Sequence, residues 1–567
     1  MNVRRHRLHA GLQWIVLLVL VGALLTMFFR HLSYPLIWHD ESDTVMFGQR
    51  VLEYGYPKVH GERNVVYGLR QDQEIGVDSE LDAYLGSPWA QYYYAAIGVA
   101  HAAATDDLYE KTARLRLPFA VAGAAGLLVL LLALLPAVEG RAPRRHLAIG
   151  FVLLAICSTS LLLHLREARY YSLAVLLAAG IVYVFARHHV YRSLGYAAYC
   201  AALVTLLFLL CNTFYPLFGV LVATLGVHHL ARALASRAPW RDRLQRLLRD
   251  GLPIAAALVA VVPGIAFLNL FAVTSAFMDL YVASPDNSYP SILRTVALHM
   301  LRFEFLGPVV VSRIAVFALG RGRTGGEGLR RRRELASFLF LFCAVHWIVV
   351  ARTPFFYERY YLAIGPMLIA ILMLDLFSIA ELARTSAIRA VRAGALGAVG
   401  AALAVSVLLR VPEMSGQLHE LRVRYRGPLD YLIPYLNDSY ADPTRLVIAT
   451  DYEEPSLMYY LGSHVIVGYY GANLERDLEL DPDVIIPRYW PAQKAAIDAL
   501  RARGDWVIQR FPVAGLPANN VPSLSPRNQA SGFTHQFETV RTEVLEHRAY
   551  LLEDADLVAS RQGLRGN

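Results

Sequence analysis

The sequence predicts an α-helical polytopic membrane protein with a small α/β domain at its C-terminal end. Three features predict this class: 56% of the 567 residues are hydrophobic, only 18% are charged, and long apolar runs recur through residues 1–410. A soluble globular protein of this length does not need so much apolar content. The net charge of +8 comes from basic residues in short links between apolar runs, which indicates cytoplasmic loops and argues against nucleic-acid binding.

The apolar runs set the number of membrane crossings. Residues 11–29 are the first run, and roughly 20 apolar residues are enough to cross a bilayer core. The later runs lie at 115–138, 146–164, 171–186, 193–211, 215–233, 251–272, 305–320, 335–351, 361–380 and 393–410. Every second link is basic, at 141–146, 187–192, 232–249, 321–333 and 384–392, as the positive-inside rule requires.

These runs predict eleven crossings, or about 11–13 if further ones are hidden, with the N-terminus inside and the C-terminal region outside. Residues 89–104 are apolar, but a crossing there would break the alternation of basic links. We therefore expect that segment to be re-entrant or to lie in the membrane interface.

An acidic motif lies near the start of the first polar loop, residues 31–87. It reads Trp38-His39-Asp40-Glu41-Ser42-Asp43, and apolar residues at near-helical spacing follow it as far as Gly55. One carboxylate could serve as a helix N-cap, but capping does not explain three. Asp78, Glu80 and Asp82, later in the loop, could bring an acceptor or a divalent cation to the site, or could belong to a solvated loop.

Two arginine-rich stretches, 166–171 and 352–361, fall on the outer side, where positive charge is otherwise avoided. Helical spacing would put Arg166, Arg169 and Tyr170 on one face, and Arg359 with Tyr360 repeats the pairing. A single such arginine could simply snorkel to the interface. A cluster of them favours an anionic lipid phosphate at headgroup depth, which Arg binds bidentately and a Tyr hydroxyl supports.

Beyond residue 410 the apolar runs shorten to strand length, at 445–451, 464–470, 483–487, 506–511 and 549–553. This change predicts an extracytoplasmic α/β domain over residues 411–567. Its acidic cluster, Asp451, Glu453 and Glu454, could bind a cation, but the pattern favours solvated surface charge.

Several short motifs follow one another in an order that is typical of a known family. They are the acidic motif at 38–43, Ser87-Pro88-Trp89, the run 114–118, the stretch 166–171, and Arg359-Tyr360 with Pro366. In this order the chain resembles the GT-C superfamily of membrane glycosyltransferases over roughly residues 10–410. More narrowly, it resembles glycosyltransferase family 39, the protein O-mannosyltransferases and the bacterial aminoarabinose transferases that act on lipid A. One departure is that Ser172-Leu173-Ala174 follows the Arg-Tyr stretch, where relatives of the aminoarabinose type often carry an acidic residue.

The resemblance implies transfer of a sugar, with inversion, from a polyprenyl-phosphate donor to an acceptor hydroxyl or phosphate at the outer face of the membrane. It implies that Asp40 is the catalytic base, while Glu41 orients the acceptor or shares a divalent cation with Asp40, and Asp43 is a nearby alternative. The groups expected to hold the donor phosphate are Arg166, Arg169, Tyr170, Arg359 and Tyr360.

A transporter or flippase for a lipid or glycan, without transferase activity, is the alternative, and it would carry charges inside several spans. Here charges gather at the outer rim, with Asp375 the main exception, which favours an interfacial enzyme. The acceptor stays open between a protein hydroxyl, lipid A or another glycolipid, and a surface polysaccharide, and the sugar is also open. The richness in Arg and Ala, with few Lys, predicts a bacterial cytoplasmic-membrane protein.

Overall fold

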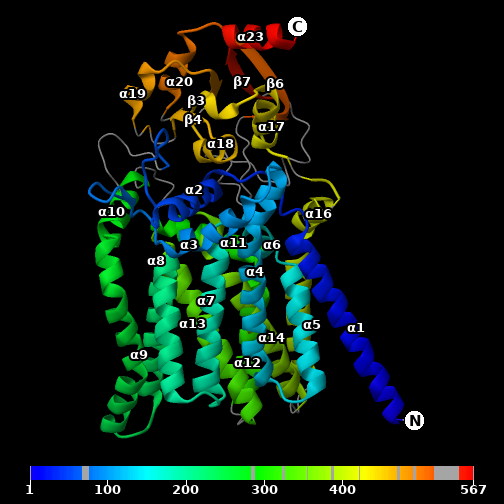
Figure 1. Ribbon diagram of the computed structural model, residues 1–567. Helices are drawn as coiled ribbons and strands as arrows, with labels where there is room; N and C mark the ends of the chain where they lie inside the picture. The colour runs from blue at the N-terminus through cyan, green and yellow to red at the C-terminus, as the bar shows by residue number, and fades with distance from the viewer. Residues whose placement is uncertain are drawn as a thin grey trace.

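Long apolar helices form a layer beneath an α/β domain in the computed structural model (Figure 1). The structure describes every residue except 1, 67–75, 282–287, 322–325, 354–355, 385–388, 421, 425, 469–470, 472, 489–492, 516–547 and 566–567. The helices of the layer are α1 (Asn2–Phe29), α4 (Leu108–Leu134), α5 (Arg141–Ile156), α7 (Tyr171–Phe185), α8 (Tyr196–Ala235), α9 (Trp240–Phe267), α12 (Leu306–Gly320), α13 (Glu327–Val350), α14 (Ile364–Arg384) and α15 (Arg389–Leu408).

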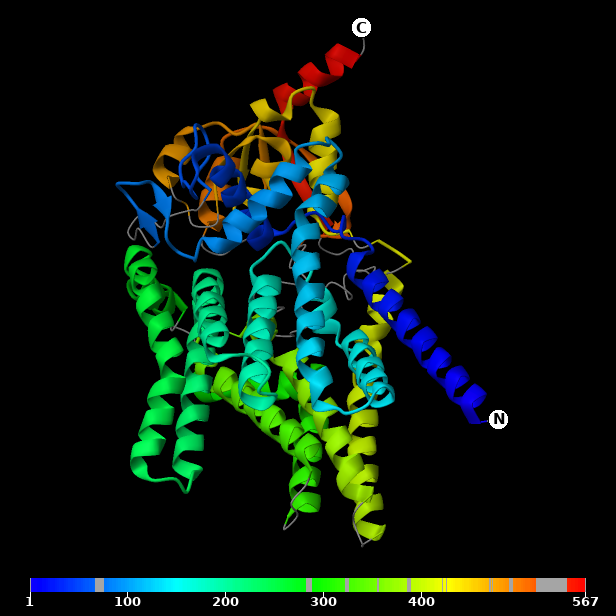
Figure 2. The ribbon, with the colours of Figure 1, turned by 60° about the horizontal axis from the view of Figure 1, so that its bottom comes forward.

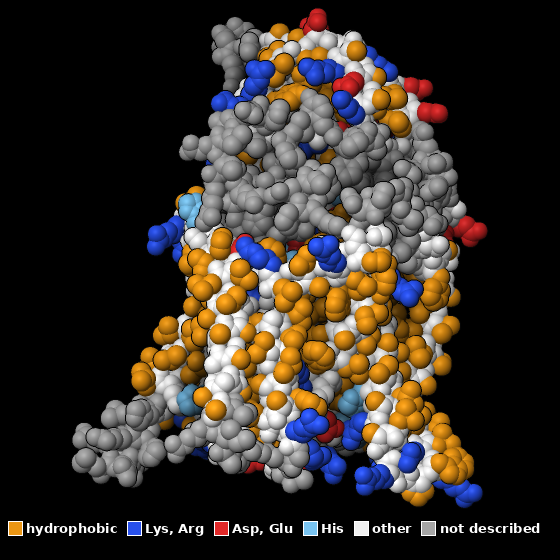
Figure 3. Space-filling model, turned by 180° about the vertical axis from the view of Figure 1, so that it is seen from behind, with side chains coloured by type: hydrophobic (Ala, Val, Ile, Leu, Met, Phe, Trp, Pro, Cys, Tyr) orange, Lys and Arg blue, Asp and Glu red, His pale blue; other side chains and the backbone are white. Residues whose placement is uncertain are grey.

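Within the described residues, seven helices are long and apolar enough to cross a membrane. The pair Tyr289–Phe303 (α11) and Leu306–Gly320 (α12) passes the same test together and is bent by 86° at its break. Hydrophobic side chains cover most of the helical layer on the face drawn in Figure 3, and Lys and Arg gather at its lower edge. The polytopic membrane fold predicted from composition is confirmed.

Helix α8 contains two crossings. A straight helix of 40 residues would be about 60 Å long, twice the thickness of a bilayer core. The helix breaks at Phe214, whose backbone is not helical (φ −152°, ψ 88°). Its two ends then meet again, because the rings of Tyr199 and His229 both lie about 5 Å from the ring of His189. The separate runs predicted at 193–211 and 215–233 are therefore the two limbs of a helical hairpin.

The described residues of the basic links lie at one end of the layer, here called the link end. Near it, Arg332 donates to the carbonyl of Ala137 at 3.2 Å, and Arg232 pairs with Glu334 at 2.8 Å. Figure 2 shows α8 and α9 joined there, at the end remote from the α/β domain. The alternation of basic and non-basic links predicted from the sequence therefore corresponds to two opposite ends of the layer.

The other end faces the α/β domain and is here called the domain end. Its elements are α2 (His39–Tyr54), β1 (Val77–Asp78), β2 (Ala83–Tyr84), α3 (Ala90–Ala102), α6 (Thr159–His164), α10 (Leu270–Tyr281), α11, η4 (Glu358–Tyr361) and α16 (Val411–Glu420). Helix α3, part of the ambiguous segment 89–104, packs beside α2 so closely that a Cβ on Gly48 would lie 3.0 Å from Ala95. This position fits the interfacial alternative for that segment. Two short turns, η1 (Leu135–Ala137) and η2 (Ala186–Val190), close helices at the link end.

The C-terminal domain is built around a five-stranded sheet of order β4-β3-β5-β7-β6. Strands β4, β3 and β5 are parallel, and β7 and β6 extend the sheet in antiparallel fashion. All five strands lie where short apolar runs predict them. The elements are α17 (Leu429–Ser439), η5 (Pro443–Arg445), β3 (Val447–Thr450), α18 (Glu454–Leu461), β4 (His464–Val467), α19 (Leu474–Glu479), β5 (Val484–Ile486), α20 (Lys494–Arg501), β6 (Trp506–Ala514), β7 (Arg548–Asp554) and α23 (Ala555–Arg565).

This domain is bound directly to the start of α2. Ser456 on α18 donates to the carbonyl of Ile37 at 2.9 Å, and its hydroxyl lies 2.9 Å from that of Ser42. Asp430 on α17 accepts a hydrogen bond from the backbone of Leu36 at 3.0 Å. The acidic motif thus lies between the helical layer and the α/β domain, in contact with both.

Candidate active site

Helix α2 presents the acidic motif at its first turn. The helix starts after Trp38, whose side chain makes no capping hydrogen bond, and ends at Gly55 in the left-handed conformation (φ 85°). Gly55 closes the helix as the sequence predicts, because a glycine adopts this conformation without steric cost. None of the three carboxylates is the N-cap, so capping does not account for them. Asp40 and Glu41 nevertheless sit in the first turn, where the helix dipole favours negative charge.

Asp40 is shared by two arginines that come from loops far apart in the chain. Arg359 donates to its Oδ2 at 3.3 Å, and Nη2 of Arg169 lies 3.8 Å from the same oxygen. Arg169 also donates to the backbone carbonyl of Asp40 at 3.0 Å and to the Thr44 hydroxyl at 2.8 Å. The Asp40 side chain keeps 25% of its surface exposed. The predicted carboxylate Asp40 and two of the predicted phosphate ligands, Arg169 and Arg359, therefore meet in one cluster.

The pKa values of Asp40 and Asp43, the two aspartates of α2, are shifted in opposite directions. Burial alone would raise the pKa of Asp40, but the positive charges of Arg169 and Arg359 outweigh it, and the pKa lies below its ordinary value. Asp43 lies 3.6 Å from Arg169. Burial, helped by the negative charges of Asp40 and Glu454, raises the pKa of Asp43 to about 6. Pairs of carboxylates with separated pKa values are typical of acid–base sites.

Arg359 is also held by aromatic rings. Its guanidinium carbon lies 4.7 Å from the centre of the Trp38 ring and 4.5 Å from that of Tyr357. Tyr170 stacks on Phe214 with ring centres 4.6 Å apart, and Tyr360 lies 6.4 Å from the same ring. The kink of α8 therefore contacts both tyrosines predicted to bind phosphate.

Arg166 contacts another part of the chain, just after α1. Residues 165–170 form turns between α6 and α7, so the prediction that Arg166, Arg169 and Tyr170 share a helix face is wrong. In this segment the backbone of Ala168 donates to Glu41 of α2 and does not continue the hydrogen bonds of α6. Arg166 donates to the carbonyl of Arg30 at the end of α1, at 3.3 Å.

Glu41 is fully buried and faces the other way. Arg116 of α4 donates to both of its oxygens, from Nε at 2.7 Å and from Nη2 at 2.5 Å, and the backbone of Ala168 donates at 2.8 Å. The other nitrogen of Arg116 donates to the carbonyls of Leu32 and Pro35. These bonds engage both oxygens of Glu41, and a metal ion shared by Asp40 and Glu41 stays a prediction. Among the described residues, no three His, Cys, Asp or Glu side chains are arranged to hold a metal ion.

The acidic residues later in the first loop have local partners. Asp78 accepts hydrogen bonds from the backbones of Glu80 and Leu81, at 3.0 and 2.9 Å, which forms a turn. Asp82 binds the ring of His60 at 2.6 Å. Glu80 is exposed. These contacts shape the loop, and the acceptor role of the three residues stays a prediction.

Several residues of the site are not apparent in the sequence. A buried chain leads from Glu167 to His164 (2.6 Å) and from His164 to Glu358 (3.7 Å), beside Arg359. From the α/β domain, Tyr452 stacks on His39 at 4.8 Å, and Glu454 lies 3.7 Å from its Nδ1. The only available signal was the position of these charged residues at the ends of apolar runs.

The acidic cluster of the α/β domain corrects one expectation. Asp451 and Glu453 are fully buried and Glu454 is 5% exposed, so the solvated surface predicted for them is wrong. Arg488 explains this burial, because it pairs with Glu453 at 3.2 Å and its backbone donates to Asp451 at 2.6 Å. Glu454 is turned toward α2.

Comparison with protein-family models finds no match, and comparison with curated proteins finds none either. Solved structures do match. The apo crystal structure of ArnT from Cupriavidus metallidurans is 14% identical, with a TM-score of 0.53, and the match covers 88% of this chain and 96% of that one. The crystal structure of the same protein bound to undecaprenyl phosphate is 13% identical, with a TM-score of 0.54, covering 96% and 98%. At these identities the likeness concerns the fold, and it extends over nearly the whole chain.

Proposed function

Because the chain has the fold of the GT-C membrane glycosyltransferases, we propose that it transfers a sugar from a polyprenyl-phosphate donor to an acceptor hydroxyl or phosphate. One observation carries the proposal: Arg169 and Arg359 converge on one oxygen of Asp40 at the domain end of the layer. Two guanidinium groups offer ten N–H donors, more than one carboxylate can accept. The cluster can therefore take a further anion, and a phosphate is the one that arginine forks fit.

The donor class is supported by the neighbour in fold. ArnT, the neighbour in fold, was crystallised bound to undecaprenyl phosphate, which is a polyprenyl phosphate. In our proposal Arg169 and Arg359 bind the phosphate, with Tyr170 and Tyr360 beside them. Arg166 is a more distant member, since its described bond goes to the end of α1.

The transfer forms one bond and breaks one. The acceptor oxygen attacks the anomeric carbon from the face opposite the phosphate, and the bond from that carbon to the phosphate oxygen breaks. The polyprenyl phosphate leaves with the electron pair, and the arginines stabilise its growing negative charge. When the acceptor is a hydroxyl, its proton passes to a carboxylate.

Asp40 is the proposed base. While the arginines pair with it, its proton affinity is low. A phosphate that binds those arginines weakens this attraction, and Asp40 then accepts a proton more readily. Asp43 is a second candidate, because a pKa of about 6 suits a base near neutral pH. Glu41 positions α2 through its bonds to Arg116. No step of the proposed reaction uses a cation.

The orientation follows from charge. Basic links lie at the link end, and positive links are retained in the cytoplasm. We therefore place the site and the α/β domain at the outer face of a bacterial cytoplasmic membrane.

The test is Asp40→Asn in a strain that lacks the native gene, with mass spectrometry of surface glycans, lipids and proteins as readout. General acid–base catalysis contributes about 10²–10⁴-fold, so we expect the transferred sugar to fall at least 100-fold at an equal protein level. Asp106→Asn, an exposed aspartate before α4, is the matched control and should keep full transfer.

Full transfer by Asp40→Asn would refute the base assignment, and Asp43→Asn then decides whether Asp43 holds that role. A purified protein that moves lipid-linked sugar across vesicles and forms no product would support the transporter alternative.

A further inference from the structure

His164 is the last residue of α6, and its side chain contacts both of the loops that carry the arginines of the site. The side chain is fully buried, and each ring nitrogen faces a carboxylate. Nδ1 lies 2.6 Å from Oε1 of Glu167, and Nε2 lies 3.7 Å from Oε1 of Glu358. The first distance is that of a hydrogen bond, and the second is that of an ion pair. One imidazole therefore contacts two glutamates from different loops.

Each of these glutamates is close in the chain to an arginine of the site. Glu167 is two residues before Arg169, and Glu358 is the residue before Arg359. Asp40 joins the two arginines, while the imidazole joins the glutamates beside them. The same two stretches of chain are thus joined at two places, which restricts the separation of the two arginines.

Helix α6, which carries the imidazole, is itself held in place. Ser160, one turn before His164, donates to Glu304, a buried residue at the break between α11 and α12. The hydroxyl of Ser158 donates to the same carboxylate at 3.4 Å. Helix α6 can therefore act as a fixed support for the two loops.

The burial of both glutamates makes a positive charge on His164 necessary. Glu167 and Glu358 are 3% and 2% exposed, and a buried carboxylate needs a cation or hydrogen-bond donors beside it. Two carboxylates next to one imidazole favour its protonated form, in which both ring nitrogens donate. The charge of Arg359 also acts on both carboxylates. Without the imidazolium, they would compete with a bound phosphate for Arg359.

We propose that His164 is a positioning residue, which sets the separation of Arg169 and Arg359 and keeps Arg359 available to the donor phosphate. The proposal rests on the proposed function, in which these two arginines bind that phosphate. His164 acts through Glu167 and Glu358 and does not touch the donor itself.

Two amide substitutions of His164 separate its two contacts. The amide nitrogen of Asn can take the place of Nδ1, so His164→Asn keeps a donor toward Glu167 and removes the one toward Glu358. The longer side chain of Gln can take the place of Nε2, so His164→Gln does the reverse. Both variants are studied as full-length protein in detergent, by backbone hydrogen exchange and by binding of undecaprenyl phosphate.

Hydrogen exchange reports whether the loops are held. His164→Asn should speed exchange in η4, where the backbone of Tyr360 donates to the carbonyl of Tyr357 at 3.1 Å. His164→Gln should speed it at residues 165–170, where the backbone of Arg169 donates to the carbonyl of Glu167 at 2.7 Å. Exchange at the link end should not change, because such openings are local. Unchanged exchange in both loops would overturn the proposal.

Donor binding reports whether the arginines are positioned. His164→Asn should weaken binding of undecaprenyl phosphate about 10-fold, within the range of couplings in one ion-pair network. Because the effect passes through Arg359, the double variant with Arg359→Gln should bind no more weakly than Arg359→Gln alone. A residue needed only for folding would add its own loss. Unaltered binding by His164→Asn, or losses that multiply in the double variant, would overturn the proposal.

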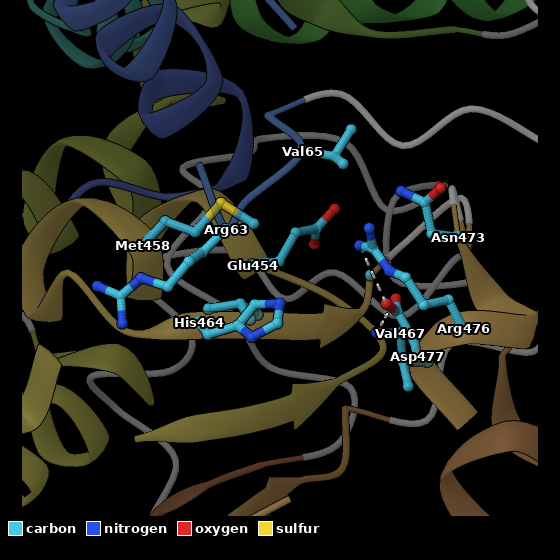
Figure 4. A pocket seen from close by; sticks show the side chains of 11 residues that line it. Arg63, Val65, Glu454, Met458, His464, Val467, Asn473, Arg476 and Asp477 are labelled. Carbon is cyan, nitrogen blue, oxygen red and sulfur yellow. Dashed lines mark hydrogen bonds and ion pairs between the residues drawn. The ribbon is translucent and has the colours of Figure 1, made fainter. Parts of the chain in front are cut away.

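Two other histidines provide matched controls. His229 is also buried and lies 3.6 Å from Asp250, at the link end. His464, with Arg476 and Asp477, lines a hollow of the α/β domain, whose cavity of about 30 Å³ has room for about two water molecules (Figure 4). His229→Asn and His464→Asn should both bind undecaprenyl phosphate like the unaltered protein. A loss in His229→Asn as large as that in His164→Asn would also overturn the proposal, because the effect would then not depend on the two loops.

The two readouts separate this proposal from the proposed function. If the unaltered protein does not bind undecaprenyl phosphate, the donor assignment fails. Hydrogen exchange then decides by itself whether His164 holds the two loops together.

Discussion

Two neighbouring carboxylates of α2, Asp40 and Glu41, pair with arginines in opposite ways. Glu41 is fully buried, and Arg116 meets both its oxygens at 2.5 and 2.7 Å. Asp40 keeps a quarter of its side chain exposed, and its arginines lie at 3.3 and 3.8 Å. A closed, bidentate pair holds elements together, whereas a looser pair with surplus donors remains available to a ligand. Under the proposed function, Glu41 therefore holds the site together and Asp40 takes part in the reaction.

The helical layer itself contains a pair of the first kind. Asp375 on α14 is fully buried, and Arg313 on α12 donates to it at 2.6 Å, with Ser312 at 3.0 Å. The one acidic exception among the predicted spans thus has a partner that satisfies it. This pairing fits a role in holding helices together, not in a transport path.

Breaking the closed pair of Glu41 and Arg116 should have the largest effect on the stability of the protein. Arg116→Leu leaves Glu41 buried and unpaired, which costs about 3–5 kcal/mol. We expect a clear fall in the thermal unfolding midpoint of the full-length protein in detergent. Asp40→Asn should cost less than Arg116→Leu, because Asp40 is a quarter exposed and its arginines lie at 3.3 and 3.8 Å. Equal losses of stability in the two variants would contradict the comparison.

The pH dependence of unfolding extends the comparison to Asp43. Its pKa in the folded protein, about 6, exceeds the ordinary 3.8, so the folded state holds this proton more tightly than the unfolded chain does. The stabilisation is complete below pH 3.8 and is lost as the pH rises through 6, on the order of 3 kcal/mol in all. Asp43→Asn should therefore be more stable than the unaltered protein at pH 7, with a flatter dependence between pH 4 and 6. Identical pH profiles of unfolding would show that Asp43 is not perturbed.

The open pair is tested by donor binding. Charge-assisted hydrogen bonds contribute about 1.5–3 kcal/mol, so Arg169→Gln or Arg359→Gln should weaken binding of undecaprenyl phosphate about 10- to 100-fold. Arg166→Gln is the matched control from the same loop, and we expect a smaller change, because its described bond goes to the carbonyl of Arg30. If all three variants bind equally well, the phosphate site lies elsewhere.

Much of the fold could be predicted from local patterns. The turn from α2 at Gly55, the two limbs of α8 and the five strands of the α/β domain all follow from apolar spacing and glycine placement. The same patterns failed at residues 165–170, where helical spacing was present but the backbone forms turns. There the backbone of Ala168 donates to Glu41, which lies 127 positions away in the chain, and no local pattern contains such a contact.

By itself the sequence determined the membrane layer and the alternation of its links. It also determined that carboxylates and arginines lie at one end of the layer. Apolar periodicity and charge placement act over short stretches of chain, so they can be read without the tertiary structure. Only the tertiary structure decided that Asp40, rather than Glu41, meets Arg169 and Arg359, and that Glu454 of the α/β domain faces α2. Those pairings join residues more than a hundred positions apart, and the geometry of packed helices, not spacing along the chain, selects such partners.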